Sequence, residues 1–245
     1  GSALENGGVL QVITKTLYKI GLKKANTVFF QNEHNLKFFE HNHIAKTEKV
    51  LLPGSGVNVD KFTLLDWPED KCNFIFISRI MKEKGIEEYL ACAREIKKDY
   101  PRCEFHILGY CEEAYEEDLK ALNESGIIKY HGNVNDVRPY LKDVNCLIHP
   151  SFYPERMSYV CLEAAASGRV VITTDRPGCR ETVIDGVTGF IVPTKDKDAL
   201  IKTVRKLINL TSEEQREMGL SGRKNAIEKF DRRIVVDKYI AQIEN

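Results

Sequence analysis

The sequence predicts an α/β fold in which a doubly wound parallel sheet carries helices on both faces. Two observations support this prediction. Apolar runs without polar alternation, at Asn73–Ile77, Glu104–Leu108 and Cys146–His149, are typical of strands buried on both faces. Segments with helical spacing of apolar residues separate these runs. The chain has 245 residues, enough for one large domain or for one domain and part of another.

The first 50 residues resemble the end of a different domain. Apolar residues at helical spacing predict a helix over 10–24, with lysines on its other faces. Such a helix suits a membrane surface, but we favour a packed helix with solvated lysines. A strand is predicted at 27–30 and a short helix at 35–39. Because a lone strand is not stable by itself, we assign 1–52 to a remnant of an N-terminal domain with its linker, and 53–245 to a C-terminal domain.

The C-terminal domain is predicted to alternate strands and helices after the turn Pro53-Gly54-Ser55-Gly56. The predicted strands are 73–77, 104–108, 127–130, 146–149, 170–173 and 190–192. The predicted helices are 85–100, 114–125, 137–142, 158–167 and 198–209, with more helix toward the C-terminus. Ligands of open parallel sheets bind beyond the carboxyl ends of the strands. We therefore expect the site in the loops after residues 77, 108, 130, 149 and 173.

Composition excludes several classes of protein. The 36 basic and 36 acidic residues cancel, so bulk charge gives no reason to expect nucleic-acid binding. No apolar run approaches the roughly 20 residues that cross a bilayer, and the start GSALENGG has no signal-peptide pattern. The seven cysteines form no CxxC motif, and no Cys/His cluster has zinc-site spacing. We expect free thiols in a reducing compartment, and hence a cytoplasmic protein.

Three predicted loops are candidates for binding an anion or a base. After residue 77, Arg79 and Lys84 stand beside a helix start, an arrangement that suits a polyanion; a solvated loop is the simpler alternative. No Walker loop is present. After residue 108, Gly109 either lets a ligand approach the backbone or serves a turn, and the two interpretations are equally weighted. The loop 131–134 either lines a base edge or is a turn.

The loop after residue 149 gives the sharpest indication of function. Glu155 precedes a predicted helix and Glu163 lies inside it, with seven residues between them. Eight helical steps would place them on different faces, so Glu155 must come from the loop. The helix's first amides, around Met157–Val160, would then lie between two carboxylates that can accept from ribose or hexose hydroxyls. For Glu163 the alternative is a solvent-facing position.

Asp196-Lys197-Asp198 has the DxD spelling that some sugar transferases use to hold a metal. Here it begins a predicted helix, and an aspartate in that position caps backbone amides and offsets the helix dipole. We therefore interpret it as a cap.

These residues resemble the retaining glycosyltransferases of family 4, which have the GT-B fold and a Glu-seven residues-Glu motif. The segments that match, in order, are Pro53–Asn58, Arg79 with Lys84, Pro150–Glu155, Leu162–Gly168, Val171–Asp175, Gly178–Glu181 and Gly186–Val192. The resemblance runs from about residue 27 to 245.

The resemblance implies a Rossmann-like C-terminal half that binds a nucleotide diphosphate sugar, without a cofactor or an essential metal. It assigns Arg79 and Lys84 to phosphates, Glu163 to ribose, and Glu155 to the sugar as the catalytic residue. The other positions assigned to the sugar donor are Gly109, Val134, Met157, Ser158, Tyr159 and Val160. It also implies transfer of a hexose-type sugar, with retention, to a saccharide or lipid-linked acceptor in polysaccharide biosynthesis. The acceptor would bind an N-terminal domain, and the full-length enzyme could lie at the inner face of the membrane.

The chain departs from the family pattern in three ways. Position 156 is Arg where Gly is usual, and its guanidinium could block the sugar pocket, add a phosphate contact, or pair with Glu155 and hold it away from the sugar. Position 159 is Tyr where Asn is common. The resemblance also leads us to expect that most of the N-terminal domain lies outside this sequence, as in a truncated piece or one half of a split enzyme. The last helix, 231–243, is then expected to lack its partner.

Two alternatives to a sugar transferase stay open. One is a sugar-nucleotide phosphorylase or synthase of the same fold that acts on a glucan. The other is a nucleotide-binding module or partner subunit without catalysis of its own. Neither composition nor motif identifies the sugar, the base or the acceptor.

Overall fold

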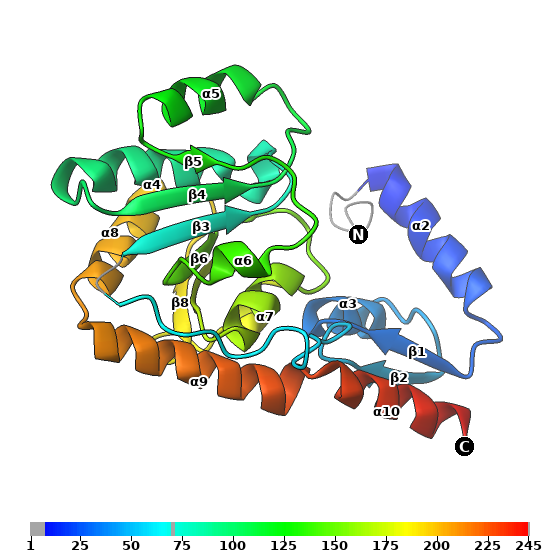
Figure 1. Cartoon of the computed structure of the whole chain (residues 1–245). Helices are drawn as coiled ribbons and strands as arrows, with labels where there is room; N and C mark the ends of the chain where they lie inside the picture. Colours follow the sequence, from blue (N-terminus) through cyan, green and yellow to red (C-terminus); the bar gives the residue numbers. More distant parts are fainter. Residues whose placement is uncertain (1–7, 70–71, 245) are drawn as a thin grey trace.

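The computed structural model describes residues 8–69 and 72–244, and in it two parallel sheets lie side by side (Figure 1). One sheet has two strands in the order β1-β2, and the other has six in the order β5-β4-β3-β6-β7-β8. The strands are β1 (Thr27–Phe30), β2 (Glu48–Leu51), β3 (Asn73–Ile77), β4 (Glu104–Leu108), β5 (Lys129–Tyr130), β6 (Cys146–His149), β7 (Val170–Thr174) and β8 (Gly189–Val192).

Helices follow most of the strands. They are α2 (Gly8–Gly21), α3 (Glu33–His41), α4 (Ile86–Asp99), α5 (Glu116–Glu124), α6 (Arg138–Leu141), α7 (Tyr159–Ala166), α8 (Lys197–Ile208), α9 (Ser212–Phe230) and α10 (Arg232–Ile243), with 3₁₀ turns η1 (Lys82–Lys84) and η2 (Arg180–Thr182). The predicted strands after residue 70 are all present, and the predicted α/β fold is confirmed. Bounds differ by one or two residues, because helix ends and edge strands are the least determined by sequence pattern.

The strand order of the large sheet reverses between β3 and β6. From β3 the chain winds outward through β4 to β5, then returns to β6 and winds the other way through β7 to β8. Phe74 of β3 lies in register with Cys146 of β6. The loops after β3 and β6 are therefore neighbours, at the point where doubly wound sheets bind ligands.

Side chains of the large sheet alternate between two buried clusters. Phe74, Phe76 and Phe105 pack with α4 and α8 on one face. Ile75 and Leu147 pack with α7 and the end of α9 on the other. Both faces are covered, as the uninterrupted apolar strands predict.

The N-terminal segment contains one strand that the sequence analysis missed. β2 pairs in parallel with β1, from Thr27 opposite Glu48 to Phe30 opposite Leu51. Its sequence, EKVL, begins with two charged residues and is only half-buried, so it lacks the apolar run that marks the other strands. The prediction of a lone strand is therefore wrong.

The last helix does find a partner, in contrast to the expectation. α10 runs back along the small sheet (Figure 1), where the rings of Phe29 and Tyr239 lie 4.4 Å apart. Lys238 donates to the Leu51 carbonyl over 2.9 Å. These contacts join the end of the chain to β1 and β2.

Helix α2 differs from the prediction of a packed helix. It has the predicted amphipathic pattern, but it buries no residue, and the side chains of Leu17 and Ile20 are more than 60% exposed. Its contacts with α3, where the rings of Tyr18 and Phe39 lie 5.2 Å apart, leave most of the apolar face exposed. None of the described helices combines the length and the apolar character needed to cross a bilayer. The N-terminal pattern expected to lack a signal lies mostly in residues 1–7, outside the described part.

Candidate functional site at the switch point

Backbone contacts tie η1 to the loop that follows β6. Gly85 ends η1 with φ 81°, and a Cβ there would lie 2.3 Å from the Pro150 carbonyl oxygen. Only glycine fits this conformation and this close approach. The amides of Phe152 and Tyr153 both donate to the Glu83 carbonyl over 2.9 Å. These contacts fix the two loops relative to each other.

The two predicted phosphate-binding cations converge on one aromatic ring. The Arg79 Cζ lies 5.4 Å, and the Lys84 Nζ 4.6 Å, from the centre of the Tyr153 ring. Arg79 also pairs with Glu112 over 2.6 Å, and Lys84 pairs with Glu155. The structure thus brings the predicted basic pair together, and it adds Tyr153 as their shared packing surface.

Glu155 lies in the loop, as predicted, and its carboxylate pairs with Lys84. The Ser151 hydroxyl donates to it over 3.4 Å, and the His149 Nε2 is 3.8 Å away. Burial acts to raise the pKa of Glu155, but His149 and the Lys84 ammonium outweigh burial and hold this pKa at about 2. The Arg156 side chain is exposed, and the partner of the carboxylate is Lys84 and not the Arg156 guanidinium, which was one of three possibilities considered from the sequence.

The N-terminal segment and residues 53–58, here called the linker, both contact the Glu155 loop. The side-chain amide of Asn32 donates to the Arg156 carbonyl over 2.8 Å and to the Glu155 carbonyl over 3.4 Å. A Cβ on Gly54 would lie 2.7 Å from the buried Met157 side chain, so the linker backbone packs directly on this loop. The small sheet and the linker therefore help to position Glu155.

Helix α7 begins at Tyr159, shortly after Glu155, the residue that pairs with Lys84. Its N-cap residue, Ser158, makes no side-chain cap, and the Ser158 amide donates to the Gly178 carbonyl over 2.6 Å. Met157 is buried. The amides of Tyr159 and Val160, in the first turn, have no acceptor within the helix. Of the amides predicted to face the donor at 157–160, the Ser158 amide is therefore already used within the chain, and the role of the others stays a prediction.

Glu163 lies further along α7, half-buried, and not on the solvent face considered as the alternative. Burial raises the pKa of Glu163 to about 7, with the Lys61 charge lowering this pKa and the Asp136 charge raising it. A carboxyl in such a place is suited to accept from ligand hydroxyls. Its assignment to ribose stays a prediction.

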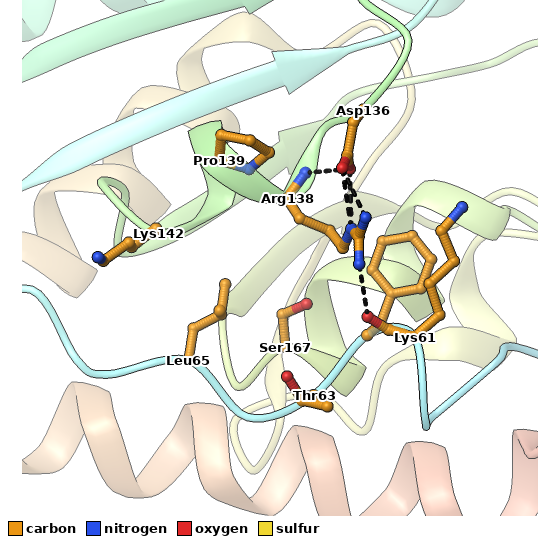
Figure 2. A pocket seen from close by; sticks show the side chains of 9 residues that line it. Lys61, Thr63, Leu65, Asp136, Arg138, Pro139, Lys142 and Ser167 are labelled. Atoms are coloured by element: carbon orange, nitrogen blue, oxygen red, sulfur yellow. Dashed lines mark hydrogen bonds and ion pairs between the residues drawn. The ribbon is translucent and has the colours of Figure 1, made fainter.

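A pocket of about 290 Å³ lies between residues 61–65 and α6 (Figure 2), and Lys61 and Asp136, whose charges act on Glu163, are in its lining. Arg138 pairs with Asp136 over 2.7 Å and donates to the Lys61 carbonyl over 3.5 Å. Ser167, also in the lining, is buried. The lining includes none of Arg79, Glu155 and Glu163, so the pocket is separate from the predicted phosphate position.

Gly109 has a structural reason to be glycine. Its φ is 144°, and a Cβ would lie 1.8 Å from the Ser78 carbonyl oxygen. Its amide donates to the Gly132 carbonyl over 2.8 Å, which joins the loops after β4 and β5. Val134 packs against the cluster under α7. The contacts of Gly109 and Val134 with a sugar donor stay predictions.

Asp196 is a helix cap, as predicted from the sequence. Its carboxylate accepts from the Ala199 amide over 2.8 Å at the start of α8. Within residues 8–69 and 72–244, no three His, Cys, Asp or Glu side chains are grouped to hold a metal ion. All seven cysteines are free, and five of them are buried.

Comparison with known proteins identifies the family to which the chain belongs. Residues 60–225, more than half of the chain, match the family described as glycosyl transferases group 1. The chain belongs to this family. Arg79, Lys84, Glu155 and Glu163 all lie inside the matched region of this group 1 chain.

Relatives of this group 1 chain are longer than the chain itself. It is 25% identical over 249 positions to the N,N'-diacetylbacillosaminyl-diphospho-undecaprenol alpha-1,3-N-acetylgalactosaminyltransferase of Campylobacter jejuni, covering 95% of this chain and 64% of that protein. It is 30% identical over 211 positions to the capsular polysaccharide biosynthesis glycosyltransferase CapM of Staphylococcus aureus, covering 79% of this chain and 55% of that protein.

Solved structures share the fold of this group 1 chain at low sequence identity. Anabaena HepE in complex with UDP has a TM-score of 0.79 at 16% identity, over 94% of this chain and 67% of that one. Sucrose-phosphate synthase from Thermosynechococcus elongatus has a TM-score of 0.77 at 20% identity, over 98% and 63%. The expected GT-B half is thus confirmed as the fold.

Sequence reasoning missed three residues of the group 1 site: Asn32, His149 and Tyr153. His149 is the polar end of an otherwise apolar strand, which is a weak signal that a buried polar group faces a site. Tyr153 lies in the loop 150–155, where no helical or strand periodicity singles out a residue. Asn32 is recognisable from sequence only as a helix cap, because its second contact lies 124 residues away.

Proposed function

We propose that the chain is the sugar-donor-binding half of a retaining glycosyltransferase of family 4. In this proposal it transfers a hexose-type sugar from a nucleotide diphosphate sugar to a saccharide or lipid-linked acceptor, and the rest of the enzyme holds the acceptor. The observation that supports this most is the convergence of Arg79, Lys84, Glu155 and the first turn of α7 at the switch point.

In this proposal, different residues bind the diphosphate leaving group, the transferred sugar and the ribose. Arg79 and Lys84 neutralise the diphosphate, and the amides at the start of α7 donate to it, so no metal is needed to stabilise the leaving charge. Glu155 faces the sugar and stabilises the positive character that develops at the anomeric carbon in the transition state. Glu163 accepts from the ribose hydroxyls.

The relatives' names agree with this proposal in chemical class. The Campylobacter jejuni protein is named for transfer of N-acetylgalactosamine to a diphospho-undecaprenol-linked acceptor, and the HepE structure holds UDP. We extend only the class to this chain: a nucleotide sugar as donor, with UDP as the first nucleotide to test.

The test is calorimetric titration of the chain with UDP, GDP and ADP in the presence of a chelator. We expect one nucleoside diphosphate to bind, and Arg79→Ala to weaken it by about 1.5–3 kcal/mol, as for loss of a hydrogen bond to a charged group. Arg216→Ala, an exposed arginine of α9, is the matched control and should not change the affinity.

Two outcomes would contradict the proposal. The first is unchanged affinity in the Arg79→Ala variant, which would show that Arg79 does not bind the diphosphate. The second is binding that disappears in the chelator and returns with Mg²⁺ or Mn²⁺, which would show that nucleotide binding requires a metal ion.

A further inference from the structure

His149 is a buried side chain whose two ring nitrogens make no hydrogen bond within the described residues. The residue is 2% exposed at the end of β6. A neutral imidazole has one N–H to donate and one nitrogen to accept, and leaving both unpaired in the interior is unfavourable. Native structures rarely keep such a group without a functional reason.

The surroundings of His149 indicate what would use its N–H. The Nε2 lies 3.8 Å from the Glu155 Oε1, just beyond a hydrogen bond, and this is the same oxygen that pairs with Lys84. Lys84 is also a cation that a diphosphate would recruit. When Lys84 turns to phosphate, the buried Glu155 loses its ion-pair partner, and an uncompensated buried charge costs several kcal/mol.

We propose that His149 is a positioning residue for Glu155: its N–H donates a hydrogen bond to the Glu155 carboxylate when the diphosphate of a sugar donor binds Lys84. This inference rests on the proposed function. A shift of less than about 1 Å brings the Glu155 oxygen to hydrogen-bond distance from the Nε2. The free site is then a closed arrangement in which Lys84 and Glu155 satisfy each other, and donor binding exchanges their partners.

The charges around His149 give the direction of its titration. In the free site, burial lowers the pKa of His149, Glu155 raises it, and Lys84 lowers it further. The charge of Glu155 also acts on the buried thiols of Cys161 and Cys179, and burial raises the pKa of both, so they stay neutral. A bound diphosphate cancels the Lys84 charge and lets Glu155 approach, and both changes raise the pKa of His149.

The first experiment observes the ring directly. The chain has six histidines, so ¹³C-labelled histidine gives few ring signals, and the one lost in His149→Gln is assigned to His149. We expect the titration midpoint of this signal to rise by about one pH unit or more at saturating UDP-glucose, whose diphosphate does not titrate near neutral pH. A midpoint that is the same with and without UDP-glucose overturns the inference.

The second experiment is a double-mutant cycle read by calorimetry with UDP-glucose. His149→Phe removes the N–H, and should weaken binding about tenfold, whereas His149→Gln keeps a donor and should stay within about threefold of the unaltered chain. In a Glu155→Gln background there is no charge to receive, so His149→Phe should have no further effect. An equal loss in both backgrounds shows a purely structural ring and overturns the inference.

Failure of the underlying function gives a different result. If none of UDP-, GDP- and ADP-glucose binds, the proposed function fails and this inference fails with it. If UDP-glucose binds and Arg79→Ala weakens it, but the His149 results are negative, only the role of His149 is overturned. Should His149→Phe not fold, the ring titration of the unaltered chain still decides.

Discussion

At the scale of single residues, the site places two carboxyls of one motif in opposite electrostatic environments. Glu155 lies beside a cation, and its pKa is held at about 2. Burial of Glu163 outweighs the charge of Lys61 and raises the pKa of Glu163 to about 7. At neutral pH the first is charged, and the second is close to half-protonated. Two carboxyls of separated pKa are a common sign of divided roles in a site.

The raised pKa of Glu163 makes a stability prediction. Between pH 4.5 and about 7 the folded chain holds a proton on Glu163 that the unfolded chain has lost, so this contribution is present at low pH and is lost as pH rises through about 7. Glu163→Gln should therefore match the unaltered chain near pH 4.5 and exceed its stability by about 2–3 kcal/mol at pH 8.

Urea unfolding at the two pH values measures this difference. The control is Glu117→Gln, at an exposed position on α5, which should give the same difference from the unaltered chain at both pH values. A Glu163→Gln effect that is independent of pH would contradict the buried, protonatable carboxyl.

At the scale of elements, the site depends on contacts between loops that belong to different parts of the chain. The loop after β6 is fixed by η1 on one side, through the Glu83 carbonyl, and by Asn32 on the other. Asn32 also caps α3, where its side-chain oxygen accepts from the Asn35 amide over 2.9 Å. One side chain thus joins the start of α3 to the backbone that presents Glu155.

Replacement of Asn32 tests this connection. Asn32→Ala removes the cap and leaves the Arg156 carbonyl without its donor, so we expect a loss of about 1–2 kcal/mol of stability and faster amide exchange at 155–157. The control is Asn42→Ala, which removes a side-chain bond to the Phe38 carbonyl at the other end of α3 but touches no site loop. Equal exchange at 155–157 in both variants would mean that Asn32 supports the helix alone.

At the scale of the whole molecule, the features predictable from the sequence are those that depend on residues close together along the chain. The six-stranded sheet was predictable because its strands are apolar on both faces, and the Glu155–Glu163 pair because both lie within one loop and helix. Strand β2 was not predictable, because it is half-exposed and no pattern of neighbouring residues indicates that it pairs with β1. The support of Glu155 by Asn32, and the ion pair with Lys84, required the loops to be placed in space.

The ion pair between Lys84 and Glu155 also changes one expectation from the sequence. The motif alone predicts that Glu155→Gln leaves free-nucleotide binding almost intact. Because Glu155 competes with phosphate for Lys84, its neutral variant should bind UDP more tightly, by several-fold. Glu163→Gln should weaken UDP and UDP-glucose alike, since both ligands share the ribose that it is proposed to contact.

The central claim, that the two glutamates bind different parts of one sugar donor, is tested most directly by calorimetry of both variants with UDP and UDP-glucose. The account predicts that Glu155→Gln does not weaken UDP binding but reduces the extra affinity of UDP-glucose over UDP. It predicts that Glu163→Gln weakens both ligands by the same factor. Equal losses of UDP affinity in the two variants would contradict it.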